Sequence, residues 1–352
     1  MDKNISTIQS KNLNIIKGIA ILMVIMIHCD FRGRLQQDYS MPFDIYMQCI
    51  TREIVFDAVP LFFFVSGFLF YLKEESIWLK WKKRLKSLLI PYLLWCSFYF
   101  IFLLFTQRVL GLERFFSGDK LKLIADFDVI DYLRVFWDIR DGGPILAPLW
   151  FLRNLIVLCI LAPVFNFFAQ RLKYLFPIIL LVNYFYVHWN ILVVTDNNML
   201  FFGGGIYLCS TNIKLDFLDR FSLKYLAPIW LILLTAVMIA YAKNLMAYDI
   251  LHRLFMIIDC LFVYSVIDIV SHKYEIVKLL KITTASFFIY LAHEPWISYI
   301  QSFFFKIFSL PEIFLVAMPW VFVFIAFCYT YLGHHVLSKY TPQLYRILTG
   351  SR

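Results

Sequence analysis

Charged residues are scarce in this sequence. Only 16% of its 352 residues are Asp, Glu, Lys or Arg, whereas 61% are apolar and 38 are Phe. The mean hydropathy is +0.73, which excludes a soluble protein of ordinary composition. Internal repeats, linkers and low-complexity tracts are also absent. The simplest organisation is therefore one integral-membrane domain over residues 1–352.

The sequence also lacks the spacings of a disulfide framework or a metal site. Its seven cysteines show no C-x-x-C pattern, and five of them lie within apolar runs. Only Cys29 and Cys49 could pair. The first apolar run ends at His28 without an A-x-A cleavage pattern, so we expect an anchor and not a removed signal. The net charge of +9 would suggest nucleic acid in a soluble domain, but in a membrane protein its distribution matters more, so no nucleic-acid partner is expected.

Long apolar runs are what the sequence has in abundance. A membrane helix needs about 20 apolar residues, and such runs predict an all-α, polytopic bundle of about ten transmembrane helices. They lie at 12–30, 58–72, 85–106, 148–169, 174–194, 198–212, 225–242, 251–270, 282–303 and 313–333.

The charges in the segments between these runs predict how the helices are oriented across the membrane. Successive segments alternate between the two sides of the membrane. Those on the side of the termini contain 19 Lys and Arg residues and 6 acidic residues, and those on the opposite side contain 12 Lys and Arg residues and 15 acidic residues. Because cytoplasmic loops carry the excess of Lys and Arg, both termini are predicted to be cytoplasmic. The acidic segment 107–147 is then external and reads as a solvated surface loop.

The most informative stretch is Lys17 to His28, in which ten residues separate two polar side chains within an apolar helix. Eleven helical steps place both on one face, roughly 16 Å apart. Ionisable groups within a span usually face a bundle interior or a water-filled cavity. The alternative is that Lys17 reaches the lipid headgroups and His28 ends the span at the other interface.

Other polar groups could join such a chamber. Ser66 precedes Gly67 in a Phe-rich span, where helix packing is the simpler interpretation. Arg153 lies about a turn below the interfacial Trp150 and needs a partner, either a carboxylate, a substrate carbonyl or an anionic head group. The three glycines at 203–205 indicate a broken or closely packed helix.

Two later spans carry further candidates. Asp259 is the deepest acid and a natural partner for Arg153 or a histidine. Tyr290 and His293 share a helix face with Ser286, which gives a second polar stripe. Two stripes with an intramembrane Arg and Asp suggest a polar chamber inside the bundle.

A basic cluster precedes the third long run. It contains Lys83, Arg84 and Lys86, which could clamp the phosphates of a nucleotide-bearing substrate. It could equally serve as a topology signal that touches anionic lipid.

Several of these segments together resemble the acyltransferase 3 family. The signature of a basic residue, ten residues and His is matched by NIIKGIAILMVIMIH. It is followed in the family's order by FFFVSGF, IPY, LWFLRNL and SFFIYLAHEP, at 62–68, 90–92, 149–155 and 286–295. Each motif is short and apolar, so it is their order that is specific.

The resemblance implies a membrane O-acyltransferase. Such an enzyme takes an acyl group, usually acetyl, from cytoplasmic acyl-coenzyme A to a hydroxyl of a surface glycan or its lipid-linked precursor. It implies acyl-coenzyme A as co-substrate, no permanently bound cofactor, no metal, and a bacterial inner membrane. His28 matches the essential His and Lys17 its basic partner. The family's Arg-x-x-Arg pair becomes Lys83 and Lys86, which departs from the usual residues because Lys lacks the bidentate fork of Arg.

The chemistry suits these residues. A neutral imidazole has a reference pKa of about 6.5, so His28 could take the proton of an attacking hydroxyl, and Lys17 or Arg153 could stabilise the oxyanion. Alternatively, His28 or Ser66 could carry the acyl group transiently. Tyr290 and His293 are assigned a role in acceptor binding. The competing interpretations are a glycan or lipid exporter whose polar residues line a path and a sensor with a degenerate site.

Overall fold

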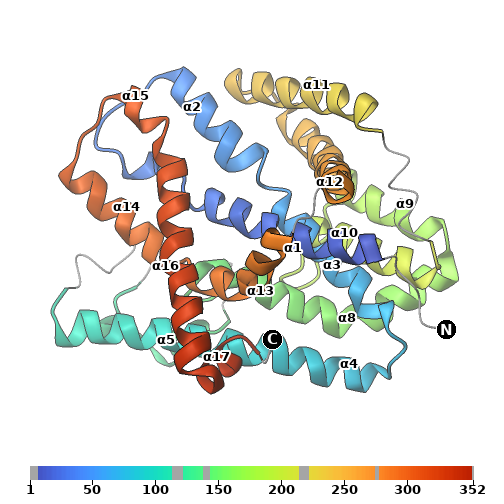
Figure 1. The fold of residues 1–352 in the computed structure, drawn as a ribbon, viewed down its shortest axis with the longest axis horizontal. Helices are drawn as coiled ribbons and strands as arrows, with labels where there is room; N and C mark the ends of the chain where they lie inside the picture. Colours follow the sequence, from blue (N-terminus) through green and yellow to red (C-terminus); the bar gives the residue numbers. More distant parts are fainter. Residues whose placement is uncertain (1–6, 113–121, 138–142, 214–221, 274–276, 351–352) are drawn as a thin grey trace. The chain divides into compact units, whose positions relative to one another are not determined.

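The computed structural model describes residues 7–112, 122–137, 143–213, 222–273 and 277–350 (Figure 1). These residues are almost entirely helical. They include no β-strand, only an isolated bridge between Ile191 and Val194. The all-α prediction is therefore confirmed.

The chain forms two compact units. The larger comprises Met1–Glu75, Leu161–Trp189 and Thr195–His335, and the smaller comprises Ser76–Ile160, Asn190–Val194 and Val336–Arg352. Helices α8 (Trp150–Leu172) and α16 (Met318–Tyr340) contribute to both. Whether the chain is functionally one domain, as the sequence predicts, stays a prediction.

The larger unit is built around α1, which packs against α3, α12 and α13 (Figure 1). Two other close pairs are α3 with α10 and α11 with α12. The helices are α1 (Thr7–Ile27), α2 (Met41–Gln48), α3 (Ala58–Leu72), α9 (Leu175–Val182), α10 (Asp196–Ser210), α11 (Leu223–Ala242), α12 (Tyr248–Lys273), α13 (Val277–Ala292), α14 (Trp296–Ile307) and α15 (Glu312–Leu315). Short 3₁₀ or π turns are η1 (Arg32–Arg34), η2 (Cys49–Glu53) and η7 (Asn183–Val187).

The smaller unit begins with an almost continuous helical run. Its elements are α4 (Ile77–Arg84), η3 (Leu85–Leu89), α5 (Ile90–Leu104), η4 (Phe105–Val109), η5 (Ile124–Asp126), α7 (Val129–Arg134), η6 (Ala147–Leu149) and α17 (Pro342–Leu348). Helix α17 packs against α5. The segment 107–147, predicted to be external, thus contains short helical turns, while its parts at 113–121 and 138–142 lie outside the described residues.

Seven helical segments of the described chain are long and apolar enough to cross a membrane. They coincide with seven of the ten predicted runs. Two further runs correspond to shorter helices, α9 with η7 and the 15-residue α10, and the run at 282–303 is divided into α13 and α14. A multi-pass membrane bundle is confirmed, while the count of ten and the cytoplasmic termini stay predictions.

One predicted boundary is wrong. The sequence assigns 30–57 to an external loop, but α2, η2 and α3 form one helical segment over Met41–Leu72, which contains a stretch apolar enough to cross a membrane. Glu53 and Asp57 consequently lie inside a candidate span, and both are buried. Their charges made this stretch look like a loop, because a sequence cannot show that Glu53 is hydrogen-bonded to residues almost 200 positions away.

Small residues allow α3 and α10 to pack closely. A Cβ atom at Gly67 would collide with the carbonyl oxygen of Phe202, and one at Gly205 with that of Phe64. Helix α10 is continuous through the glycine triplet, so of the two predicted possibilities the closely packed helix is confirmed. The possible Cys29–Cys49 disulfide is not formed, since all seven cysteines are free.

Candidate active site

The site is built around the end of α1. This helix ends at Ile27, and the backbone N–H of His28 still donates to the carbonyl of Ile25 at 3.0 Å. His28 is therefore held by the last helical turn, while its side chain is 28% exposed. Buried Ile25 and Met26 anchor the turn behind it.

A second helix end meets His28. Helix α13 ends at Ala292, and α14 begins at Trp296. Pro295 lacks a backbone N–H and interrupts the helical hydrogen bonding. The break carries His293 and Glu294, which are 0% and 6% exposed. Gln301 of α14 ties the two ends together, because its Nε2 donates to the carbonyl of His28 at 3.1 Å.

Glu294 is the carboxylate that faces His28. Its Oε1 lies 3.4 Å from His28 Nδ1 and accepts a hydrogen bond from Ser298 Oγ at 2.7 Å. Arg34 in turn donates to Ser298 Oγ at 2.9 Å and to the carbonyl of Asp30 at 3.0 Å. Ser298, itself held by Arg34, thus fixes the same carboxylate oxygen that faces the imidazole.

This arrangement can activate a hydroxyl group. When Nδ1–H of His28 points at Glu294, the lone pair of the imidazole is on Nε2. A base oriented by a carboxylate is the arrangement that general-base and nucleophilic catalysis require. The sequence did not single out Glu294, because an acid beside a proline at the end of an apolar run resembles an interfacial residue.

His293 lies beside the same ring. The ring centroids of His28 and His293 are 5.1 Å apart. His293 Nδ1 lies 2.7 Å from the carbonyl of Tyr290, and since a carbonyl only accepts, Nδ1 carries the hydrogen. Nε2 is then an acceptor, and it has no hydrogen-bond partner among the described residues. Tyr329 donates to the carbonyl of His293 and holds the backbone in place.

The structure brings together two of the predicted polar stripes. Tyr290 is buried, and its ring centroid is 6.1 Å from that of His293. Lys17 lies three turns before His28 on α1, and its Nζ donates to Asn14 at 3.4 Å. At about 1.5 Å per residue, Lys17 is at the other end of the helix from the His28–Glu294 pair.

A polar network adjoins the site on the side of Asp30. Arg32 forms ion pairs with Asp30 and Asp44, both at 2.8 Å, and donates to Gln48 at 3.2 Å. Gln48 donates to Glu53 at 3.0 Å.

Glu53 is the centre of this network. It is 2% exposed and accepts from Tyr248 at 2.7 Å, and its Oε2 lies 2.6 Å from His252 Nδ1. His252 and Asp259 are seven residues apart, so the sequence predicts that they share a helix face. The structure pairs it instead with an acid predicted to lie in a loop.

The remaining candidates of the larger unit are placed as follows. Ser66 is half-buried in α3 beside the packing residue Gly67. Asp259 is 1% exposed and accepts from the indole N–H of Trp230 at 2.6 Å. That indole is a partner the sequence did not suggest, and the pairing of Asp259 with Arg153 stays a prediction.

The smaller unit holds the other candidates. Arg153 is 3% exposed, donates to Asn154 at 3.2 Å and lies over the ring of Trp137 at 5.8 Å. Lys83 and Lys86 are exposed and Arg84 is half-buried, at the junction of α4 and η3. Within the described parts of the chain, no group of three His, Cys, Asp or Glu side chains could hold a metal ion.

Comparison with known proteins identifies the family of the chain. A family model described as an acyltransferase domain matches residues 10–338. The chain belongs to the acyltransferase 3 family. It is a multi-pass membrane acyltransferase, and the match runs across both compact units.

One relative of this acyltransferase is the succinoglycan biosynthesis protein ExoH of Rhizobium meliloti (strain 1021). The two are 22% identical over 369 residues, which cover 100% of this chain and 94% of the relative. No solved structure matches this acyltransferase.

Proposed function

We propose that this acyltransferase moves an acyl group, acetyl in the first instance, from acyl-coenzyme A to a hydroxyl of a cell-surface polysaccharide or lipid-linked glycan, in a bacterial inner membrane. The observation that carries the proposal is the His28–Glu294 pair, in which Nδ1 and Oε1 lie 3.4 Å apart and the ring of His293 is 5.1 Å from that of His28. The glycan acceptor is supported by the relative named for succinoglycan biosynthesis.

The reaction assigns a step to each group. His28 Nε2 takes the hydroxyl proton as the alcohol oxygen attacks the thioester carbonyl, and Glu294 stabilises the imidazolium that forms. Collapse of the tetrahedral intermediate breaks the carbon–sulfur bond, and the proton leaves with the coenzyme A thiol. The sequence suggests Lys17 or Arg153 for the oxyanion, but Lys17 lies about 16 Å along α1 from His28 and is too far away to contact it. A transient acyl-His28 or acyl-Ser66 is the relay form of the same reaction.

The donor and acceptor contacts follow from charge and hydrogen-bonding capacity. Lys83, Arg84 and Lys86 are proposed to bind the phosphates of acyl-coenzyme A, which is a co-substrate and not a resident cofactor. His293 and Tyr290 are proposed to bind the acceptor, because a lone pair at His293 Nε2 can accept a hydrogen bond from its hydroxyl. A His293→Leu variant with unchanged acceptor kinetics would remove His293 from this role.

The first test is transfer of labelled acetyl from acetyl-coenzyme A in membranes that contain the native protein or His28→Ala at matched levels. We expect coenzyme A release and glycan-bound label with the native protein, and loss of both with the variant. If neither protein consumes the donor while export of the surface glycan depends on the chain, the exporter interpretation replaces this one. A folded His28→Ala protein with full transfer activity would contradict the role of His28.

A further inference from the structure

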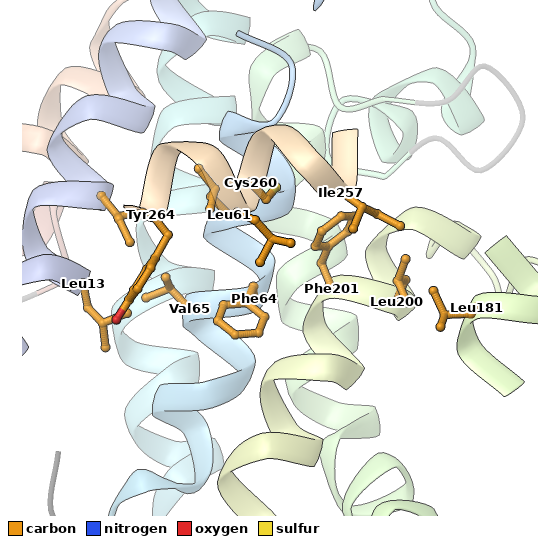
Figure 2. Close-up of a pocket in the computed structure, with 12 residues that line it drawn as sticks. Leu13, Leu61, Phe64, Val65, Leu181, Leu200, Phe201, Ile257, Cys260 and Tyr264 are labelled. Carbon is orange, nitrogen blue, oxygen red and sulfur yellow. The ribbon is translucent and has the colours of Figure 1, made fainter. Parts of the chain in front are cut away.

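The proposed reaction needs a hydrogen-bond donor close to His28, because the attacked carbonyl oxygen becomes an oxyanion. The apolar cavity of the larger unit, about 210 Å³ in volume, does not provide one (Figure 2). No Lys or Arg lines this cavity. Its wall on α1 is formed by Leu13 and Ile16, which lie about 18 Å or more along the helix from His28. The cations that lie closer to His28 are arginines grouped around Asp30.

Two of these arginines belong to η1, and their nitrogens are already in use. Arg32 donates to Asp30 through Nε at 3.0 Å and through Nη2 at 2.8 Å, and its Nη1 pairs with Asp44 at 2.8 Å. Arg34 donates through Nη1 to the carbonyl of Asp30, and through Nε and Nη2 to two serine hydroxyls of α14. Both guanidinium groups are therefore held by the protein itself.

Arg52 is the third arginine at Asp30, and its contacts differ from those of the other two. Its Nε donates to Asp30 Oδ2 at 3.3 Å. Within the described parts of the chain, its Nη1 and Nη2 donate to no other residue. The side chain is 42% exposed. The two terminal amino groups of Arg52 are thus available to a substrate, while Nε fixes the position of the guanidinium.

Arg52 and His28 lie in the same part of the larger unit. Asp30 follows His28 by two residues, so their Cα atoms are at most about 7.6 Å apart. The charge of Arg52, which contacts the Asp30 carboxylate, also acts electrostatically on the His28 ring. Both side chains are partly exposed, although they belong to candidate spans, Ile8–Arg34 and Met41–Leu72. Ionisable groups in spans usually face a bundle interior or a water-filled cavity, so both face a space that a substrate can enter.

The backbone that carries Arg52 is a π turn. In η2 the backbone N–H of Ile54 donates to the carbonyl of Cys49, five residues back, at 3.1 Å. Such turns are rare and occur frequently at functional sites. The next residue, Glu53, is buried and bonds to His252 of α12. Glu53 therefore anchors the turn, and the partly exposed guanidinium of Arg52 is presented beside it.

We propose that Arg52 is a catalytic residue that stabilises the oxyanion of acyl transfer, an inference that rests on the proposed function. As the alcohol oxygen bonds to the thioester carbonyl carbon, the π electron pair of the carbonyl moves to its oxygen and the alcohol proton moves to His28 Nε2. The Nη1 and Nη2 groups of Arg52 donate to this oxyanion. The electron pair returns as the carbon–sulfur bond breaks, and the thiolate takes the proton from His28. Asp30 positions Arg52 through Nε.

The test measures acetyl transfer by the native protein and by Arg52→Gln at matched levels, in the membrane assay used for His28→Ala. An interaction made only in the transition state lowers kcat and leaves KM unchanged. We expect kcat to fall by about 10²–10³-fold, the effect of removing one oxyanion donor, with the native KM for acetyl-coenzyme A. A raised KM with native kcat would overturn the proposal, because Arg52 would then bind the substrate before reaction.

Arg52→Lys serves if Arg52→Gln does not fold. Lysine keeps a charge that can pair with Asp30, but it has no further amino group for the oxyanion. Its kcat should therefore also fall. A native kcat in either folded variant would contradict the role of Arg52.

Arg52→Ala provides a readout that a purely structural role would not change. Free guanidinium, at a concentration that leaves the protein folded, should restore part of the lost kcat because the position is partly exposed. Tetramethylammonium has the same charge and no N–H group, so it should restore nothing. Equal effects of the two cations, or no restoration by guanidinium, would overturn the assignment.

Arg253→Gln is the matched control. Arg253 is also a partly buried arginine of the larger unit, and it pairs with Asp196 and Asp249 of α10 and α12. Its kcat per folded protein should equal that of the native protein. The same assay separates this inference from the proposed function. Transfer that is lost in His28→Ala and undiminished in Arg52→Gln overturns the role of Arg52 alone, whereas a native protein that transfers no acetyl overturns both.

Discussion

At the scale of single residues, the proposed reaction depends on how Glu294 orients the His28 ring. Substitution Glu294→Gln keeps the size of the side chain and its contact with Ser298, but it removes the charge that stabilises an imidazolium. We expect the rate of acyl transfer to fall by at least about tenfold and at most by the ~10²–10⁴-fold contribution of a whole general base. The measurement is kcat with membranes or purified protein.

The control for this prediction is Glu312→Gln, which changes an acid paired with Ser40. Its transfer rate should equal that of the native protein. A native rate in Glu294→Gln would show that His28 is oriented without this carboxylate.

The site residues differ in how far the sequence could reveal them. His28 and His293 stand out because an ionisable ring within an apolar helix has few explanations. That the two rings meet could not be predicted, since it depends on the packing of α1 against α13 across more than 250 residues. Glu53 was missed for a related reason, because its partner His252 lies on α12.

At the scale of helices, the contact between α3 and α10 depends on two glycines. Gly205→Ala would place a methyl group against the Phe64 carbonyl, which is backbone and cannot move aside cheaply. We expect a loss of about 1–3 kcal/mol in the free energy of unfolding, as for other overpacked interiors. The loss is measured by thermal unfolding in detergent, monitored by the fraction of the protein that stays monodisperse.

The neighbouring glycine is the matched control. A Cβ atom at Gly204 would meet nothing within 4 Å, and Ala is a better helix former than Gly by about 1 kcal/mol. Gly204→Ala should therefore be neutral or slightly stabilising. Equal effects at both positions would mean that helix propensity, and not the close approach of α3, determines the change in stability.

Helix α7, in the segment 107–147 that is predicted to be external, is stabilised by hydrogen bonds between charged groups. Asp131 accepts from Lys122 at 2.6 Å and from the backbone N–H of Asp128 at 3.0 Å, and these hydrogen bonds lower the pKa of its carboxyl to about 2. Because the usual pKa of Asp is about 3.9, the stabilisation is complete above about pH 4 and is lost as the pH falls through about 2.

Protease protection of the segment around α7 tests this expectation. Protection should be the same at about pH 5 and pH 8, and Asp131→Asn should reduce it at both. Protection that weakens between pH 8 and pH 5 would show that another group controls the segment.

Helices as such were well predicted from apolar runs, but their ends were not. The break between α13 and α14 falls within a run that the sequence reads as one span, and Pro295 is the only local sign of it. In the other direction, charged residues at 44–57 concealed a helix. At the break between α13 and α14 and in the helix over 44–57, tertiary contacts override the local pattern of apolar and charged residues.

At the scale of the whole molecule, the distribution of Lys and Arg predicts the orientation in the membrane. In a Cys328→Ser background, which removes the one exposed cysteine, Asp126→Cys should react with an impermeant maleimide added to intact spheroplasts. Glu74→Cys should react only in inverted vesicles, because its loop is on the basic, cytoplasmic side. The reverse pattern would contradict the predicted topology.

The close approach of α3 and α10 also bears on how the chain is made. About 120 residues separate the end of α3 from the start of α10, and at roughly 5–20 residues per second a ribosome needs on the order of 6–25 seconds to synthesise them. During that interval α3 has entered the bilayer with its glycine face uncovered. Nascent chains stalled before Asp196 should therefore be degraded by membrane proteases, whereas chains stalled after Ser210 should survive.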